Sequence, residues 1–555
     1  MASEQSPKPK IVIFSGPRAT IQNSAPLVTG ADSPPAAGFD LLRSQLLAAP
    51  VTVYIEAFSA HPMEKDVREL YGPPDGWVDP ATGDFSETAD DVFTRPVYRR
   101  TLRPEDGPYL LPYAARQADG QPWTSTYTTD PANPGGARQV FYPDASRIVA
   151  EIDRFGLDGS GRNNILGTMA DFDFVRGAPS AGYTKGQPAH ERTDLGTGDI
   201  APETPGEDFF SYAPVRREPP LPVLARLTNV VARTLASGEY SGAIWLEGSP
   251  TNEETIYWLS LLIDTTVPLV GNASQSGHGT LANDGDHNLV QSVSYITSGV
   301  WRDAEGKDRV GGVMIQNGQI FTARDVHKAD ARPGGYVAHG GHGGIVGNTV
   351  WDPVLSFIPD KRSTHRSELT LGSLPHSVTG YRRVAEAIVP VDVRVKDDGG
   401  ELLAPALPKV TIARYVNYGA DDFANTDDGE VEILARIEKN LRDFPLAGLV
   451  AEGSSPYGAM NESMRLAMQR AVLHGMPVIA VNRGSAGFVP ALASNGGLFL
   501  TGSNLSATKA RILLMACLLK FGALPVPADP EHPTDFEIEQ IRKVVGQYQQ
   551  VILSH

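Results

Sequence analysis

With 555 residues, the chain is too long for one ordinary domain, because a single hydrophobic core seldom grows beyond about 250 to 300 residues. Its composition, 41% hydrophobic and 20% charged, is typical of a globular protein and not of a disordered one. A formal net charge of −17 argues against nucleic acid or an anionic membrane surface as a partner, since neither offers positive charge to an acidic protein.

The chain contains one cysteine, Cys517, in the apolar run ARILLMACLLK. A lone cysteine cannot form a disulfide within the chain, and a buried core position is the simplest interpretation. The first residues, MASEQSPKPK, are polar, and no apolar run reaches the roughly 18 residues that span a bilayer. We therefore expect a cytoplasmic protein without a membrane segment.

Two predicted strands end in turns that carry a hydroxyl group. Residues Ile11 to Phe14 read as a buried strand and run into SGPRATIQNS, which contains Thr20. Residues Ala243 to Leu246 form a second apolar run, followed by Gly248-Ser249-Pro250 and a helix start at Glu253-Glu254. In parallel α/β sheets ligands bind at the carboxyl ends of strands, so both hydroxyls are candidate reactive groups. Ser and Thr are also ordinary turn residues, and that interpretation stays open.

The region from about 40 to 205 is rich in loop-forming residues. One strand-like segment, Val51 to Phe58, and one helix-like segment, Ala145 to Phe155, stand out in it. A structureless loop of this length is improbable in a compact fold, so we expect an insertion that folds as a lid or subdomain over the neighbouring cleft.

Regular α/β alternation resumes after the insertion. A helix is predicted where Leu224, Leu227, Val231 and Leu235 recur on one face. A buried strand follows at Val267 to Gly271, and a further helix begins near ANDGDHNL, where Asp284 fits a helix cap as well as a site residue.

The segment from Val310 to Asp330 predicts a hairpin, because Asn317-Gly318 between two apolar runs is the strongest short hairpin signal. Lys328 follows the hairpin. The loop GGYVAHGGHGG then offers His339 and His342, but two histidines in a glycine-rich loop do not make a rigid metal cage, so we expect no metal there.

A linker is predicted at 376–408, followed by a second, smaller parallel α/β domain at 409–555. Its predicted strands are Val410 to Val416, Leu446 to Ala451, Pro477 to Val481 and Leu498 to Thr501, and its helices are Val431 to Leu441, Ser463 to His474 and Ala507 to Phe521. Neither a phosphate-binding P-loop nor a dinucleotide-binding glycine fingerprint stands out, so no cofactor is expected.

Eight segments in a fixed order point to one family. They are IVIFSGPRATIQNS, IWLEGSPTNEET, ANDGDHNL, FTARDVHK, KVTIARYVNYG, LAGLVAEGSSPYG, PVIAVNRG and GSNLSATKARILL. In this order they resemble the bacterial-type L-asparaginase/glutaminase family, two-domain α/β amidohydrolases with a threonine nucleophile. The resemblance covers roughly 8–30 and 206–525. It implies a larger N-terminal α/β domain at 1–375 with a flavodoxin- or Rossmann-like parallel sheet, interrupted by the insertion, and the smaller C-terminal α/β domain.

The resemblance also assigns roles to individual residues. Thr20 matches the usual threonine nucleophile, Ser249 stands where the second motif has its catalytic threonine, and Lys328 matches the lysine that supports that hydroxyl. Such support makes chemical sense, because a hydroxyl is a weak nucleophile without a base or a lysine of lowered pKa nearby. The candidate substrate-binding residues by resemblance are Ser211, Gly248, Pro250 and Asn272.

Several departures from the family pattern concern the substrate. Pro250 replaces the aspartate that holds the substrate's ammonium group, and a proline side chain accepts no hydrogen bond. The stretch 488–497, where the family has a second acidic residue, contains no carboxylate. The first motif reads Arg18-Ala19 in place of a glycine pair, and the segment after it has no tyrosine in the family's place.

These observations favour an amidohydrolase that acts on a carboxylic amide other than free asparagine, such as a neutral, N-substituted or cyclic amide, with either Thr20 or Ser249 as nucleophile. One alternative is an L-asparaginase or glutaminase in which the insertion supplies the missing acid. Another is a binding protein without catalysis on a decayed scaffold. By resemblance, we expect a homodimer or homotetramer that binds a small-molecule amide.

Overall fold

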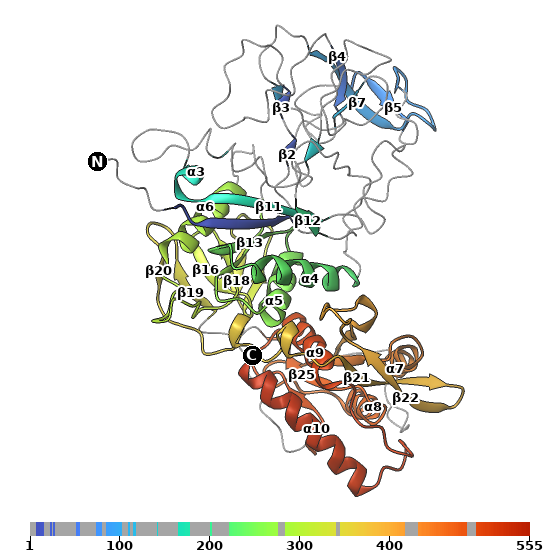
Figure 1. Ribbon diagram of the computed structural model, residues 1–555. Helices are drawn as coiled ribbons and strands as arrows, with labels where there is room; N and C mark the ends of the chain where they lie inside the picture. The colour runs from blue at the N-terminus through green and yellow to red at the C-terminus, as the bar shows by residue number, and fades with distance from the viewer. Residues whose placement is uncertain are drawn as a thin grey trace.

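The computed structural model describes residues 7–15 and 221–555, apart from 276–283, 340–343, 417–430 and 485–495, together with short stretches between 23 and 202 (Figure 1). Thr20 and Ser211 lie outside the described residues, as does most of the helix expected at Ala145 to Phe155. In the described part of the chain, no helix is both long and apolar enough to cross a membrane.

The described N-terminal part is built on a sheet of nine strands. In spatial order they are β12 (Ile200–Pro202), β11 (Asp171–Gly177), β1 (Lys10–Ser15), β13 (Gly242–Leu246), β14 (Leu269–Asn272), β15 (Val313–Gln316), β16 (Gln319–Thr322), β19 (Ile345–Asn348) and β20 (Val354–Leu355). The stretch from β11 to β15 is parallel, and antiparallel strands extend it at both edges. This confirms the predicted parallel α/β class and puts the carboxyl ends of β13 and β14 side by side.

Alternation along β1 explains why both faces of this sheet are covered. Ile11 and Ile13 join one buried cluster, which includes residues of α3 (Ile165–Met169) and α6 (Gly285–Ser298). Val12 and Phe14 join the other cluster, with α4 (Val223–Ala236) and α5 (Thr251–Leu262). Because successive side chains of a strand point to opposite faces, an unbroken apolar run is what a two-sided sheet needs.

Helix α5 is buried on nearly all sides. Ten of its residues are buried, among them Tyr257, Trp258 and Leu259. One side packs on the main sheet, and another packs on α9 (Ala507–Phe521) of the C-terminal part. A helix that is buried all round lies inside a large core, and Figure 1 places α5 between the main sheet and the C-terminal elements. The two parts of the chain therefore share this helix as a common wall.

The C-terminal part holds a parallel sheet in the order β23 (Lys409–Arg414), β24 (Ala447–Gly453), β25 (Val478–Asn482) and β26 (Leu500–Thr501). Its described helices are α7 (Val431–Asp443), α8 (Glu462–Leu473), α9 and α10 (Asp535–Ser554). The predicted strands and the first three helices are confirmed within a few residues at each end. Helix α10 was not predicted.

The stretch predicted as a linker, 376–408, contains a β-hairpin of β21 (Ser377–Val384) and β22 (Ala387–Arg394), and then a short 3₁₀ helix, η5 (Ala404–Ala406). Two backbone hydrogen bonds tie this hairpin to the C-terminal part. Tyr381 N donates to Pro445 O over 2.9 Å, and Ala523 N donates to Thr379 O over 2.8 Å. The hairpin thus packs against α7 and α9 of the C-terminal part.

The inserted region contributes strands to the main sheet and to a five-stranded sheet of its own. Strand β11 enters the main sheet beside β1, and β12 follows it at the edge. A five-stranded sheet is formed separately by β6 (Phe85–Ser86), β5 (Gly76–Val78), β7 (Arg95–Leu102), β4 (Val51–Ile55) and β9 (Ala115–Gln117). Figure 1 shows β4, β5 and β7 at the opposite end of the molecule from α10.

Two short strands that follow Thr20 pair with the inserted region. They are β2 (Asn23–Ser24), which pairs with β10 (Phe141–Tyr142), and β3 (Pro26–Leu27), which pairs with β8 (Tyr109–Leu110). The insertion is therefore attached to the segment that carries the first threonine motif.

Candidate active site

The turn that carries Ser249 is fixed by a buried asparagine. Strand β13 ends at Leu246, and α5 begins at Thr251 after a cis peptide bond between Ser249 and Pro250. Asn252 is fully buried, and its Nδ2 donates to Trp245 O over 3.1 Å and to Asn272 O over 2.7 Å. These bonds hold the ends of β13 and β14 against the first turn of α5. A side chain on Gly271 would place its Cβ 2.6 Å from Asn252 Oδ1, which explains the glycine there.

Within this turn the predicted residues differ in exposure. Gly248 is buried, and its carbonyl oxygen accepts from Asn252 N over 3.1 Å. Ser249 is half-buried and Pro250 is exposed. The hydroxyl of Ser249 is thus held on a rigid turn at the carboxyl end of a central strand.

Ser249 has a hydrogen-bond partner that the sequence analysis did not predict. Tyr336, at the start of β18 (Tyr336–Ala338), donates its hydroxyl to Ser249 Oγ over 2.7 Å. Tyr336 is buried, and burial is the main reason why its pKa is raised above the ordinary value for tyrosine. The carboxylates of Glu253, Asp284 and Glu247 raise that pKa further. The phenol therefore keeps its proton and acts as a donor to Ser249.

Lys328 reaches the same tyrosine from the neighbouring strand. It is the last residue of β17 (Val326–Lys328) and pairs directly with Tyr336 across the antiparallel β17–β18 ladder. Its Nζ lies 4.6 Å from the centroid of the Tyr336 ring and donates to Arg332 O over 3.2 Å. The structure thus brings the predicted pair, Ser249 and Lys328, to one tyrosine.

Burial lowers the pKa of Lys328 below the ordinary value for lysine, while the carboxylates of Asp284, Asp330 and Glu253 oppose that shift. A lower pKa enlarges the neutral fraction of the amine near neutral pH. A neutral lysine amine can accept a proton, which is what a general base must do, and here it contacts the tyrosine that bonds to Ser249.

Glu253 connects α5 to the lysine strand. It lies in the first turn of α5 and is 4% exposed. Its carboxylate accepts from Lys328 N and interacts with His327 Nδ1 at 3.2 Å. The bond to Glu253 is the main reason why the pKa of His327 is raised. Since the Glu253 carbonyl oxygen also accepts from Lys509 Nζ of α9, one residue joins three elements around the site.

Asp284 and Asn272 lie near the Ser249 turn and make different kinds of contact. Asp284 is at the cap position of α6 but forms no side-chain cap; its carboxylate instead accepts from Gln275 N over 3.0 Å. Asn272 is 1% exposed, and its Nδ2 donates to Ser292 Oγ over 2.9 Å and to Ile315 O over 3.2 Å. Those bonds connect α6 and β15, so Asn272 holds the strand ends together. A role for Asn272 in substrate binding stays a prediction.

The sequence does contain a signal that Tyr336 pairs with Lys328. The stretch KADARPGGY places two glycines and a proline between Lys328 and Tyr336, a composition that predicts a turn between two short strands. Reading it as a hairpin would have placed the two residues side by side. Among the described residues, no group of three His, Cys, Asp or Glu side chains is arranged to hold a metal ion. His339 lies 5.6 Å from His327 between ring centroids, and His342 is outside the described part.

Comparison with known proteins places this site within a family. Residues 221–336, which run from α4 to Tyr336, match the family model described as asparaginase, N-terminal. That segment is therefore an asparaginase-family domain, and the expected kinship is confirmed.

Individual sequence relatives match parts of the chain. The chain is 30% identical over 174 residues to the glutaminase-asparaginase of Pseudomonas fluorescens biotype A, a match that covers 30% of this chain and 45% of that protein. It is 23% identical over 299 residues to L-asparaginase 2 of Bacillus subtilis strain 168, covering 54% of this chain and 66% of that protein. The solved structure of a probable cytoplasmic L-asparaginase from Campylobacter jejuni has 19% identity and a TM-score of 0.45, covering 70% of this chain and 91% of that one.

Proposed function

We propose that this protein is an amidohydrolase that cleaves a carboxylic amide, with the hydroxyl of Ser249 as nucleophile and Lys328 as its base. The observation that carries the proposal is the hydrogen bond between Tyr336 and Ser249, with Lys328 against the same tyrosine ring, at the carboxyl end of β13. The match of 221–336 to the asparaginase N-terminal domain supports the reaction class.

In the proposed mechanism, the neutral amine of Lys328 takes the proton of the Ser249 hydroxyl as Oγ attacks the amide carbonyl carbon. N–H groups of the turn stabilise the developing oxyanion, because helix N-termini favour negative charge. Lys328 then returns the proton to the nitrogen as the C–N bond breaks, which leaves an acyl ester on Ser249. Water hydrolyses this ester and the carboxylic acid is released. Tyr336 acts as a positioning residue that holds Oγ through its hydroxyl.

The substrate we propose is a neutral, N-substituted or cyclic amide. Pro250 is exposed at the turn and offers no group that pairs with an ammonium. A buried cation without a counter-charge is costly, so a substrate lacking that ammonium is favoured. The attachment of the insertion to the segment after Thr20, through β2 and β3, favours a role for the insertion in shaping the substrate pocket.

The test is the intact mass of the protein after exposure to a panel of linear, N-substituted and cyclic amides, followed by peptide mapping and release with hydroxylamine. We expect an acyl adduct on Ser249 that disappears in Ser249→Ala and persists in Thr20→Ala. An adduct on Thr20 would refute Ser249 as nucleophile. Absence of adduct and product across the whole panel would refute the amidohydrolase.

A second candidate is hydrolysis of L-asparagine or L-glutamine. It is favoured by the names of the relatives and by Asp284, a carboxylate that acts on Lys328 and Tyr336 from the edge of the site. Release of ammonia from the two amino acids, compared with release from a matched neutral primary amide such as propionamide, separates the candidates. Faster turnover of the amino acids, lost in Asp284→Asn, would favour this second function.

A further inference from the structure

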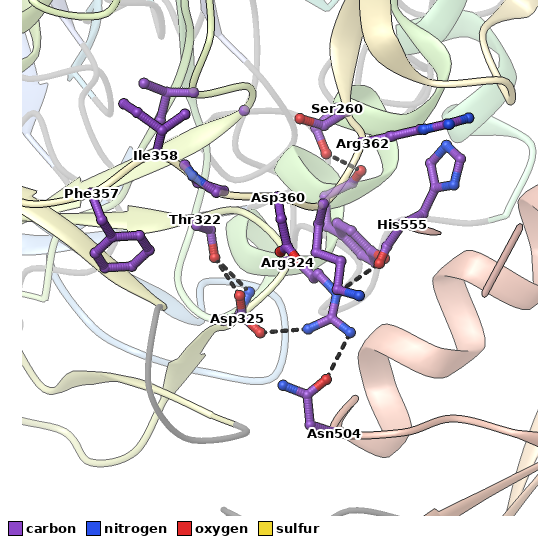
Figure 2. A pocket seen from close by; sticks show the side chains of 16 residues that line it. Ser260, Thr322, Arg324, Asp325, Phe357, Ile358, Asp360, Arg362, Asn504 and His555 are labelled. Carbon is purple, nitrogen blue, oxygen red and sulfur yellow. Dashed lines mark hydrogen bonds and ion pairs between the residues drawn. The ribbon is translucent and has the colours of Figure 1, made fainter. Parts of the chain in front are cut away.

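A cavity of about 290 Å³ lies between the two parts of the chain, away from Ser249 (Figure 2). Its walls come from α5, from the turn between β16 and β17, from the segment 357–363, and from Asn504 and His555 of the C-terminal part. None of Ser249, Lys328 and Tyr336 lines it. Its volume is near the lower end of the range for small-molecule sites, which begins at about 300 Å³.

One wall of the cavity is formed by Arg324, whose charge is balanced by a neighbouring carboxylate. Arg324 is 7% exposed, and its Nη1 donates to Asp325 Oδ1 over 2.7 Å. Its Nε donates to His555 O and its Nη2 donates to Asn504 Oδ1, both over 2.8 Å. Arg324 therefore joins the N-terminal and C-terminal parts and has its own carboxylate. A ligand is not needed to neutralise it.

Lys361 gives the cavity a cation that is bonded to a backbone carbonyl oxygen. Its Nζ donates to Leu553 O over 2.6 Å, and within the described residues no carboxylate comes within ion-pair distance of it. Burial lowers the pKa of Lys361 and the nearby Arg324 lowers it further, while the carboxylates of Asp360 and Asp325 oppose that shift. An incoming anion would relieve both effects, because an opposite charge stabilises the ammonium form.

Tyr257 gives the cavity a buried wall. It lines the cavity from the second turn of α5, is 2% exposed, and its hydroxyl has no hydrogen-bond partner among the described residues. The hydroxyl oxygen is itself inaccessible to solvent, so Lys361 is the donor that a ligand in the cavity would meet.

The opposite wall is apolar. Phe357 and Ile358 are 38% and 37% exposed although they are large hydrophobic side chains, and Pro359 continues that surface. Figure 2 shows Phe357 and Ile358 on one side of the cavity, with Arg324, Asn504 and His555 on the other. Asp360 limits the size of the negative charge that the cavity accepts. A compact monocarboxylate with a short hydrocarbon body fits this division better than a multivalent anion.

We propose that this cavity binds a small organic monocarboxylate, whose carboxylate is held by Lys361 and whose hydrocarbon body packs on Phe357 and Ile358. Through the shared elements, the bound carboxylate acts as an effector of the Ser249 site; this second part rests on the proposed function. Hydrolysis of an amide releases a carboxylic acid, so the ligand class is also the class of one product.

The connection to the active site runs through two elements. Helix α5 begins at Thr251, directly after the Ser249 turn, and carries Tyr257 about 9 Å further along its axis. Asp325, bonded to Thr322 Oγ1 over 2.7 Å, lies three residues before Lys328. Lys509 Nζ donates both to Ala323 O and to Glu253 O, so it joins these two elements directly.

The test measures binding of isovalerate and of its neutral partner isovaleramide to full-length Ser249→Ala protein by isothermal titration calorimetry. We expect binding of isovalerate and at least tenfold weaker binding of isovaleramide, because a hydrogen bond to a charged group contributes about 1.5 to 3 kcal/mol. Adding Lys361→Met should weaken isovalerate binding about tenfold. The matched control Lys439→Met, an exposed lysine of α7, should leave it unchanged.

Isovalerate binding that is unaffected by Lys361→Met, or absent at about 100 times the protein concentration, would overturn the proposed site. Thermal unfolding of each variant checks that it is folded. For the effector role, isovalerate should change kcat or KM of the Ser249 protein and not of Lys361→Met. Binding on Ser249→Ala requires no turnover, so failure of the proposed reaction and failure of this site are distinguished.

Discussion

The hydrogen bond from Tyr336 to Ser249 is the contact from which the proposed chemistry is most directly tested. Tyr336→Phe removes the hydroxyl and keeps the ring against Lys328. Because the bond holds the nucleophile, we expect kcat for amide turnover to fall about tenfold, with a smaller change in KM. Steady-state kinetics on the amide identified by mass spectrometry measures both. An unchanged kcat would contradict the positioning role.

The charge state of Lys328 gives a second prediction. Because the base must be neutral and burial lowers its pKa, activity should rise with pH through that lowered pKa, below the ordinary range of lysine. Asp330 raises the pKa of Lys328, so Asp330→Asn should move the rising limb to lower pH. Asp330 is partly exposed and bonded to Arg332, which limits the structural effect of the change.

The measurement is the dependence of kcat/KM on pH for the native chain and for Asp330→Asn. Asp398→Asn, at an exposed carboxylate of the segment after β22, is the matched control and should not shift the limb. A shift to higher pH in Asp330→Asn would contradict the assignment of the limb to Lys328.

At the scale of residues, the sequence predicted the Ser249 hydroxyl and the Lys328 amine as site groups, but it did not predict Tyr336, which contacts both. Ser249 and Lys328 stand in motifs that can be read along the chain. Tyr336 becomes a partner only through the register of β17 and β18, which a glycine-rich loop does not reveal. Glu253 has the same property, because its partners come from strands distant in the sequence.

Helix α10 illustrates at the level of elements how a local signal fixes a boundary. Thr534 accepts from Glu537 N through its hydroxyl, while the Glu537 carboxylate accepts from Thr534 N over 2.8 Å, which completes a capping box. In the sequence Thr-Asp-Phe-Glu, the three-residue spacing of Thr534 and Glu537 is the signature of such a box. Helix α10 was therefore predictable from the chain. The amphipathic pattern of α10 is only moderate, so a search for apolar periodicity alone misses this helix.

Removing this cap should destabilise the protein measurably. Thr534→Ala loses the hydroxyl that satisfies the Glu537 N–H, so we expect the free energy of unfolding to fall by about 1 kcal/mol. Thr534→Ser keeps the hydroxyl and should stay close to the native value. Urea denaturation of both variants tests this, and equal losses in the two would show that the cap is not the cause.

Other elements followed from pattern because their periodicity was strong. The hairpin at Asn317-Gly318 was predicted, and both residues have positive φ, 47° and 79°, as the tight turn between β15 and β16 requires. The hairpin β21–β22 was missed, because its faces are mostly exposed and carry little apolar alternation.

At the scale of the whole molecule, contacts between α5 and α9 help to join the N-terminal and C-terminal parts. Lys509 of α9 is 2% exposed and donates to the carbonyl oxygens of Glu253 and Ala323, which belong to the N-terminal part. Burial lowers its pKa to about 8, against an ordinary value of 10.5. Sequence alone could not reveal this buried lysine, because it sits in the amphipathic-looking run ATKARILL and its partners lie some 250 and 190 residues away.

This lysine predicts how stability changes with pH. Between pH 8 and 10.5 the unfolded chain binds more protons at Lys509 than the folded one, so its contribution to the free energy of unfolding rises with pH in that window. At 1.36 kcal/mol per pKa unit, the full rise is roughly 3 kcal/mol. Urea denaturation at pH 7.5 and 9.5 should therefore show the native chain gaining stability relative to Lys509→Met as pH increases. Lys439→Met, at an exposed position, should show no such difference. A difference that is flat or reversed for Lys509→Met would mean that Lys509 is charged as easily in the folded protein as in the unfolded chain, and that the junction between α5 and α9 does not exclude water.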